Sequence, residues 1–192
     1  RSASGSGNQY FTRFEGRPAP YNGMIEPEVI LGSAPDSSSA PHGVFAYGEL
    51  SASAVPALGV QWSTPNRDIA YVWNKEITQW LRYQDGFAHL DEVGAPLAVD
   101  NVLVLYVNYR TSSADPASPQ ALTTGSGDGW LLRDGTVTGI TWQRNFVADP
   151  WTLTDDGTGQ PVTLDPGTAW VALAKLGQGS ILGPQEVSAL VD

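Results

Sequence analysis

The side chains that could recognise a ligand first gather in the segment RPAPYN, residues 17–22. This segment brings together the guanidinium of Arg17, the phenol of Tyr21 and the amide of Asn22. An arginine fork beside an amide could bind a carboxylate, a phosphate or a sugar. Alternatively, the prolines stiffen a loop whose arginine and asparagine side chains bond the local main chain. We keep all three residues as candidate ligand-binding residues.

A second candidate is the sequence His89-Leu90-Asp91, in which a carboxylate follows an imidazole two residues later. Such a pair could orient the imidazole or hold one side of a metal site. Zinc sites commonly use several His or Cys ligands, and this chain has two histidines and no cysteine. The alternative is an ordinary surface histidine. We therefore expect no metal, no cofactor and no catalytic residue, and we keep His89 and Asp91 as ligand-binding candidates.

Patterns typical of familiar enzymes are weak or absent. Glycoside hydrolysis needs two carboxylates across a cleft. The acidic pairs Asp91-Glu92 and Asp155-Asp156 are adjacent in sequence, and neighbours on a strand point to opposite faces. The chain has no G-x-S-x-G elbow for a serine nucleophile.

The glycine-rich segment GSGDG, residues 125–129, has neither the G-x-x-x-x-G-K-[ST] order of a phosphate loop nor a helix expected after it. Strand-like residues follow it instead. We expect a loop that enters a strand at Trp130, as the end of a long polar loop over residues 111–128.

Seven tryptophans are the most unusual feature of the composition. Each lies on or beside a predicted strand: Trp62, Trp73, Trp80, Trp130, Trp142, Trp151 and Trp170. Indole rings could form a platform for sugars, or they could fill the core of a small β domain. We expect most of them in the core, and we select Trp151, next to Pro150, as the candidate ligand-binding ring.

The charge of the chain restricts its partners. Ten basic and twenty acidic residues give a net charge of −10. This average field repels a phosphate backbone, so we expect no nucleic-acid partner. No apolar run approaches the ~20 residues that a membrane helix needs, so we expect no membrane-spanning segment. The absence of cysteine excludes disulfides and thiolate metal sites.

The turn residues and alternation predict an α+β fold that is predominantly antiparallel β, with one or two short helices. The chain contains 21 Gly and 14 Pro, which disfavours long helices. We expect strands at 58–63, 101–109 and 168–173, and hairpins at 68–84, 129–144 and 149–164. The apolar segment 101–109 should be a central strand. A short helix is expected at 26–31.

Several phrases in this order resemble the YerB-like lipoprotein family, also called the DUF3048 family. They are RPAPYN (17–22), WLRYQDG (80–86), HLDEVGAPLAVDN (89–101), TGSG (124–127), GWLLRDG (129–135) and LDPGTAWV (164–171). The resemblance spans residues 8–173. Tyr21 stands where the family usually has histidine, which weakens any acid–base role there because tyrosine titrates near ~10.

The resemblance implies a bacterial, exported protein. The family is often lipid-anchored through an N-terminal cysteine, which this sequence lacks, and it has no assigned activity. It implies that residues 1–43 are a remnant of an α/β N-terminal domain, with 1–7 flexible. Residues 44–176 would be the β-rich C-terminal domain, and 177–192 a C-terminal tail.

We therefore expect an extracellular or cell-surface protein, membrane-anchored in its full-length form. It would bind an envelope glycan, another envelope component or a protein partner without catalysis. One alternative is a hydrolase acting on cell-wall carbohydrate or peptide, with Arg17, Asn22, His89 and Asp91 lining its site. Another is a structural or assembly subunit that buries an edge strand against another chain.

Overall fold

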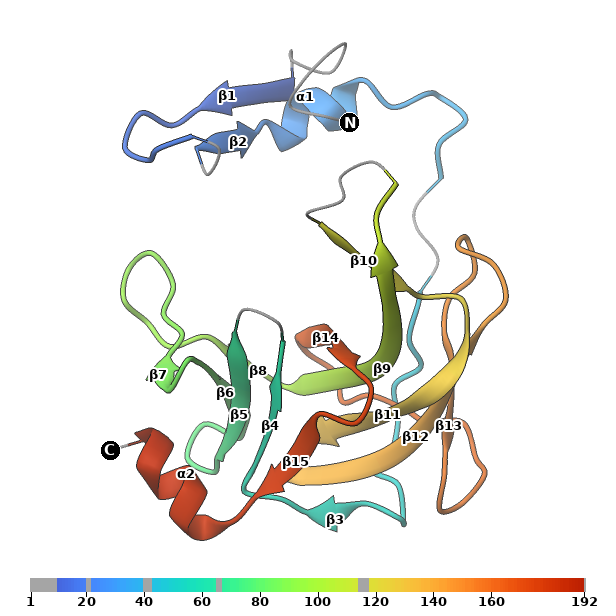
Figure 1. The fold of residues 1–192 in the computed structure, drawn as a ribbon. Coiled ribbons are helices and arrows are strands. Elements are labelled where there is room, and N and C mark those ends of the chain that lie inside the picture. The colour runs from blue at the N-terminus through green and yellow to red at the C-terminus, as the bar shows by residue number, and fades with distance from the viewer. Residues whose placement is uncertain (1–9, 20–21, 40–42, 65–66, 114–117, 192) are drawn as a thin grey trace. The chain divides into compact units, whose positions relative to one another are not determined.

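The computed structural model describes residues 10–19, 22–39, 43–64, 67–113 and 118–191 (Figure 1). The chain divides into two compact units, Arg1–His42 and Gly43–Asp192. Tyr21, His42 and the segment 1–7, which we expect to be flexible, lie outside the described residues. Each unit is considered below by itself.

The first unit is a small hairpin followed by a short helix. Strands β1 (Phe11–Arg13) and β2 (Gly23–Ile25) pair antiparallel. Helix α1 (Pro27–Gly32) begins with proline in its first turn, where the missing N–H costs no helical hydrogen bond. The predicted helix at 26–31 is thus confirmed, one residue later. No residue of α1 is buried.

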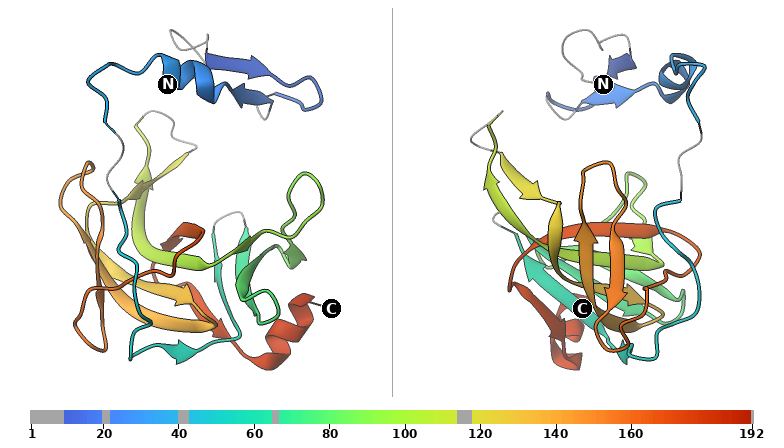
Figure 2. Two further views of the ribbon diagram at one scale, coloured as in Figure 1. Left: turned by 180° about the vertical axis from the view of Figure 1, so that it is seen from behind. Right: turned by 90° about the vertical axis from the view of Figure 1, so that its right-hand side faces the viewer.

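The second unit contains two β-sheets that pack against each other (Figures 1 and 2). The larger sheet has the order β10-β9-β11-β12-β13, with β14 also on β9 and β3 on β12; the smaller has the order β15-β4-β5-β6-β7, with β8 on β6. The bounds are β3 Val55–Pro56, β4 Gly59–Ser63, β5 Asp68–Asn74, β6 Gln79–Gln84, β7 Phe87–Ala88, β8 Ala98–Val99, β9 Asn101–Thr111, β10 Pro119–Leu122, β11 Gly125–Arg133, β12 Thr136–Arg144, β13 Thr152–Asp155, β14 Ala169–Lys175 and β15 Gly179–Leu182, followed by helix α2, Pro184–Val191.

The predicted β-rich class is confirmed, although the helical share is smaller than the label α+β implies. Helices α1 and α2 are short, and nearly all strand pairs are antiparallel. The exception is β14, which pairs parallel to β9 from Ala169↔Asn101 to Lys175↔Val107. Sequence reasoning expects a closing strand here but does not predict its direction, because the partner strand lies far upstream.

Strand β9 is central because both of its faces are buried. Alternate side chains, represented by Val104, contribute to the core between the two sheets. The intervening ones, represented by Leu103 and Leu105, enter a second core on the other face of the larger sheet. The apolar run therefore has the position that its composition predicts.

Six of the seven tryptophans lie in the apolar core clusters or pack against them, in line with the expectation that most belong to the core. Trp62, Trp80 and Trp142 are buried, whereas Trp73, Trp130 and Trp151 pack at the margins of core clusters. The Trp62 ring stacks on Tyr71 with a centroid distance of 5.7 Å. The most exposed indole is that of Trp170, at 37%, rather than that of Trp151.

The expected loop over 111–128 is wrong in its second half. Strand β10 lies within it, and β11 already begins at Gly125. The glycines permit close strand packing: a Cβ at Gly127 would lie 2.9 Å from the Tyr106 carbonyl oxygen, and one at Gly129 would overlap that of Val104. The glycines in this segment therefore indicate a close approach of two backbones and not a loop.

The segment expected as a C-terminal tail is part of the second unit. Strand β15 pairs antiparallel with β4. Helix α2 then turns Val187 and Leu190 onto a third apolar cluster that includes Ala70 and Tyr83. The short strand has no local signal of its pairing because β4 lies far upstream in sequence.

The expected hairpin at 149–164 forms only in part. Its first strand, β13, pairs with β12, and the segment that returns toward it makes only an isolated bridge, Thr154↔Pro161.

Candidate functional site

A pocket of about 330 Å³ lies on the smaller sheet, next to α2. A row of directly paired residues crosses four strands there and consists of Ser180, Gln61, Ala70 and Tyr83. Because paired residues share a face of the sheet, these side chains line one surface. Ala70 has only a methyl group between the longer side chains of Gln61 and Tyr83, so the row is hollow at its centre.

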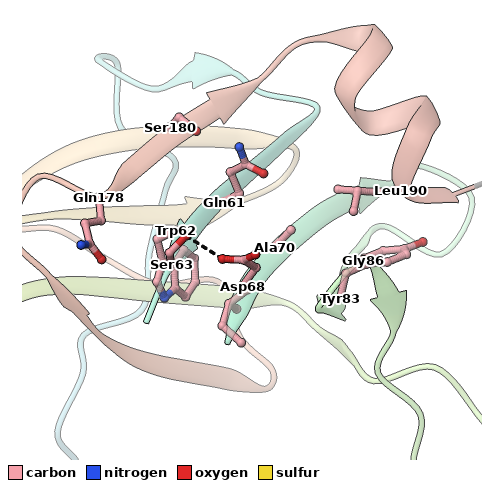
Figure 3. Close-up of a pocket in the computed structure, with 11 residues that line it drawn as sticks. Gln61, Trp62, Ser63, Asp68, Ala70, Tyr83, Gly86, Gln178, Ser180 and Leu190 are labelled. Carbon is pink, nitrogen blue, oxygen red and sulfur yellow. Dashed lines mark hydrogen bonds between the residues drawn. The ribbon is translucent and has the colours of Figure 1, made fainter. Parts of the chain in front are cut away.

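The next row adds a carboxylate to the pocket. Ser63 pairs with Asp68, and the Ser63 hydroxyl donates to Asp68 Oδ1 at 2.6 Å (Figure 3). Gln178 and Leu190 contribute from the segment before β15 and from α2. Trp62 and Ile69 also border the pocket, although they belong to the core between the sheets.

The groups around this pocket can hydrogen-bond a neutral polar ligand. Gln61 and Gln178 have amides, and Ser180 has a hydroxyl; each group can both donate and accept. Burial raises the pKa of Tyr83, so its phenol stays protonated at neutral pH. Among the described lining residues, Asp68 is the one carboxylate, and none is histidine. The lining therefore provides hydrogen-bonding groups without an acid–base pair.

Trp151 lies beside a second pocket of about 270 Å³, lined by Gln143, Arg144, Asn145, Asp149, Pro150 and Thr152. The half-buried ring packs 4.6 Å from the guanidinium carbon of Arg144. Arg144 Nε donates to the Asp149 carbonyl at 2.8 Å. Trp151 thus supports the arginine that shapes the adjacent loop, and its ring is not among the described lining residues.

His89 contacts Arg82 rather than Asp91. Its Nδ1 meets Nη1 of Arg82. A guanidinium nitrogen can only donate, so Nδ1 accepts and the imidazole is neutral. Burial and the neighbouring Arg82 charge both lower the pKa of His89. Asp91 Oδ1 instead accepts from the N–H groups of Val93 and Ala95, each at 2.9 Å, and so shapes the turn.

Arg17 and Asn22 lie in the first unit, whereas His89, Asp91 and Trp151 lie in the second. Asn22 Oδ1 accepts from Arg13 Nη1 at 2.8 Å. Arg17 is exposed, and its main-chain N–H donates to the Phe14 carbonyl at 3.4 Å. A ligand-binding role for Arg17, Tyr21 and Asn22 stays a prediction.

The sequence analysis predicts neither the residues of the pocket beside Ala70 nor Arg82 as site residues. No local pattern links Gln61 to Ser180, because their strands are far apart in the chain. The sequence does carry a signal for Arg82: it lies two residues after Trp80 in a predicted hairpin strand, so the two side chains share a face. An inward-facing charge on an apolar strand is unusual.

The described part of the chain has no group of three or more His, Cys, Asp or Glu residues that could hold a metal ion. None of the helices in that part is long and apolar enough to cross a membrane.

Comparisons with known proteins agree with the fold. The crystal structure of YerB protein from Bacillus subtilis is similar, with a TM-score of 0.71 and 19% sequence identity. The match covers 92% of this chain and 62% of the YerB chain, so this chain spans less than two thirds of its structural relative. No curated protein matches.

A family model described as the C-terminal domain of a protein of unknown function (DUF3048) matches residues 58–171. These residues include both sheets' central strands and most of the phrases that carry the resemblance. The chain belongs to the YerB-like DUF3048 family.

Proposed function

We propose that this protein is a non-catalytic component of the bacterial cell envelope and that it binds an envelope glycan in the pocket beside Ala70. The envelope location rests on the resemblance to exported lipoproteins. The choice of a glycan rests on the chemistry of the lining groups. A sugar presents many hydroxyls, which amide and hydroxyl side chains can match as both donors and acceptors.

The observation that carries the proposal is the row formed by Gln61, Ser180 and the small Ala70, with Asp68 in the next row. Ligand sites typically combine a concavity with a few placed polar groups. Hydrolysis of a glycosidic bond needs a second carboxylate, and Asp68 has none beside it among the described lining residues. Binding without hydrolysis is therefore the better match.

The test is a titration with soluble disaccharide–peptide fragments of bacterial cell wall, followed by tryptophan fluorescence. Trp62 borders the pocket and can report occupancy. We expect a saturable response, weakened about three- to tenfold by Gln61→Ala, since one neutral hydrogen bond contributes about 0.5–1.5 kcal/mol.

The matched control is Gln143→Ala, which removes the same side chain from the second pocket. It should bind the fragments like the unmodified chain. A loss with Gln143→Ala and none with Gln61→Ala would move the site to the pocket near Trp151. No response to any fragment would contradict glycan binding.

A further inference from the structure

Arg82 is a buried positive charge without an acidic partner in the part of the chain that the structure describes. It lies on β6, is 9% exposed, and shares the face of Trp80 and of its paired residue Tyr71, which belong to the core between the two sheets. The ion pairs between described residues involve Arg67 and Arg133 and do not include Arg82. Its Nε is buried and has no hydrogen-bond partner among these residues. Buried charges are normally paired, so this arginine requires an explanation.

The described residues that contact the Arg82 side chain are all neutral. Nη1 and Nη2 each lie 3.1 Å from Oε1 of Gln84, and Nη1 also meets Nδ1 of the neutral His89. The Trp170 ring lies 5.2 Å from the guanidinium carbon. Tyr71 is paired with Arg82 across the sheet; burial raises its pKa more than the arginine lowers it, so its phenol is neutral too.

Gln84 occupies the place where an anion would bind best. One amide oxygen accepts from both Nη atoms, which a carboxylate would bind with its two oxygens in a bidentate pair. A carboxylate there would also neutralise the guanidinium charge, which the amide cannot do. Gln84 and His89 are only half-buried, and Trp170 is exposed. The amide can therefore turn outward, and a ligand can approach from the surface.

We propose that Arg82, His89 and Trp170 form a binding site for a singly charged carboxylate attached to a small apolar group. The guanidinium provides the charge and the fork, and the neutral His89, whose Nδ1 accepts from Nη1, adds no competing charge. Trp170 offers an apolar face beside the carboxylate. The net charge of −10 opposes a polyanion, which favours a single carboxylate over a polyphosphate.

This site is independent of the glycan pocket. Tyr83 lines that pocket, and its neighbour Arg82 points to the opposite face of the same strand. Loss of glycan binding would leave the carboxylate site untouched, and the reverse also holds.

The test is a titration with N-acetyl-alanine followed by NMR of the Arg82 Nε–H and the His89 ring. We expect saturable shifts of both signals. N-acetyl-alanine amide, which has the same body without the charge, should produce none. Chloride at equal ionic strength controls for general salt effects. Phosphate that binds more tightly than N-acetyl-alanine would overturn the carboxylate assignment.

Gln84→Glu is the decisive variant because it places a carboxylate of the chain itself against Arg82. We expect it to weaken N-acetyl-alanine binding at least about tenfold and to raise the melting temperature. Gln143→Glu, which adds the same charge at an exposed position, should do neither. His89→Ala removes the neutral acceptor that positions Nη1 of Arg82 and should weaken binding.

Three outcomes would overturn the proposal. They are the absence of shifts, equal shifts with chloride, and binding by Gln84→Glu that equals that of the unmodified chain. None of them depends on a variant at Arg82, whose loss could prevent folding.

Discussion

At the scale of single residues, several polar side chains hold loops to the sheets. Asp155 is 1% exposed and accepts hydrogen bonds from the hydroxyls of Ser51 and Ser53. The N–H groups of Gly157 and Thr158 donate to its Oδ1 at 2.7 and 3.0 Å. Burial raises the pKa of this carboxyl, but the hydrogen bonds outweigh that effect and lower it to about 2.

This depressed pKa predicts a specific acid sensitivity. A carboxyl with a lower pKa in the folded state stabilises the fold above its unfolded pKa of ~3.9. The contribution is lost as the pH falls from there toward about 2. Urea unfolding from pH 6 to pH 2 should therefore show a smaller acid-induced loss of stability in Asp155→Asn than in the unmodified chain. Equal losses in both would contradict this role.

Asn101 should be a structural residue. It is fully buried, its Nδ2 donates to the Asp165 carbonyl at 2.8 Å, and its Oδ1 accepts from the Asp165 N–H at 2.8 Å. Asn101→Ala leaves these main-chain groups unpaired and should lower the free energy of unfolding by about 1–3 kcal/mol. Asn108→Ala, on the exposed end of the same strand, should change it little. Chemical unfolding of both variants measures the difference.

At the scale of elements, the glycines of β11 determine how closely the strands approach. Gly129→Ala would push a methyl group into the Val104 carbonyl oxygen and should cost about 1–3 kcal/mol. Gly139→Ala, on the paired strand β12, places its Cβ 3.3 Å from the end of the Asp156 side chain. Since that side chain is exposed, it can move, and the cost should be smaller. Thermal unfolding of both variants compares them, and equal midpoints would argue against the close approach.

At the scale of the whole molecule, the apolar core clusters formed by the described residues all lie in the second unit. In the described part of the first unit, Tyr10 is the one buried hydrophobic residue. A chain that begins at Gly43 should therefore fold and unfold cooperatively. Near-ultraviolet circular dichroism during heating measures this, because the core tryptophans provide the signal. A gradual loss without a transition would show that the first unit is required.

The carboxylate site at Arg82 and the glycan pocket beside Ala70 differ in how strongly the sequence indicates them. His89 can be selected as one of two histidines. Arg82 can be found because it lies two residues after Trp80, on the same face of a predicted strand. Asp91, two residues after His89, could have oriented the imidazole, but it accepts hydrogen bonds from its own loop instead. The glycan pocket had no such signal, since it depends on the pairing of β15 with β4.

The sequence by itself determined the β-rich class, the central position of 101–109, the hairpins at 68–84 and 129–144, and the packing of most tryptophans in or against the core. Alternation and turn residues act between near neighbours, so they can be read locally. Only the tertiary structure decided that β14 runs parallel to β9, that Ser180 meets Gln61, and that Arg82 is buried among neutral groups. These features arise from contacts between segments far apart in the chain, whose pairing depends on the packing of the whole unit.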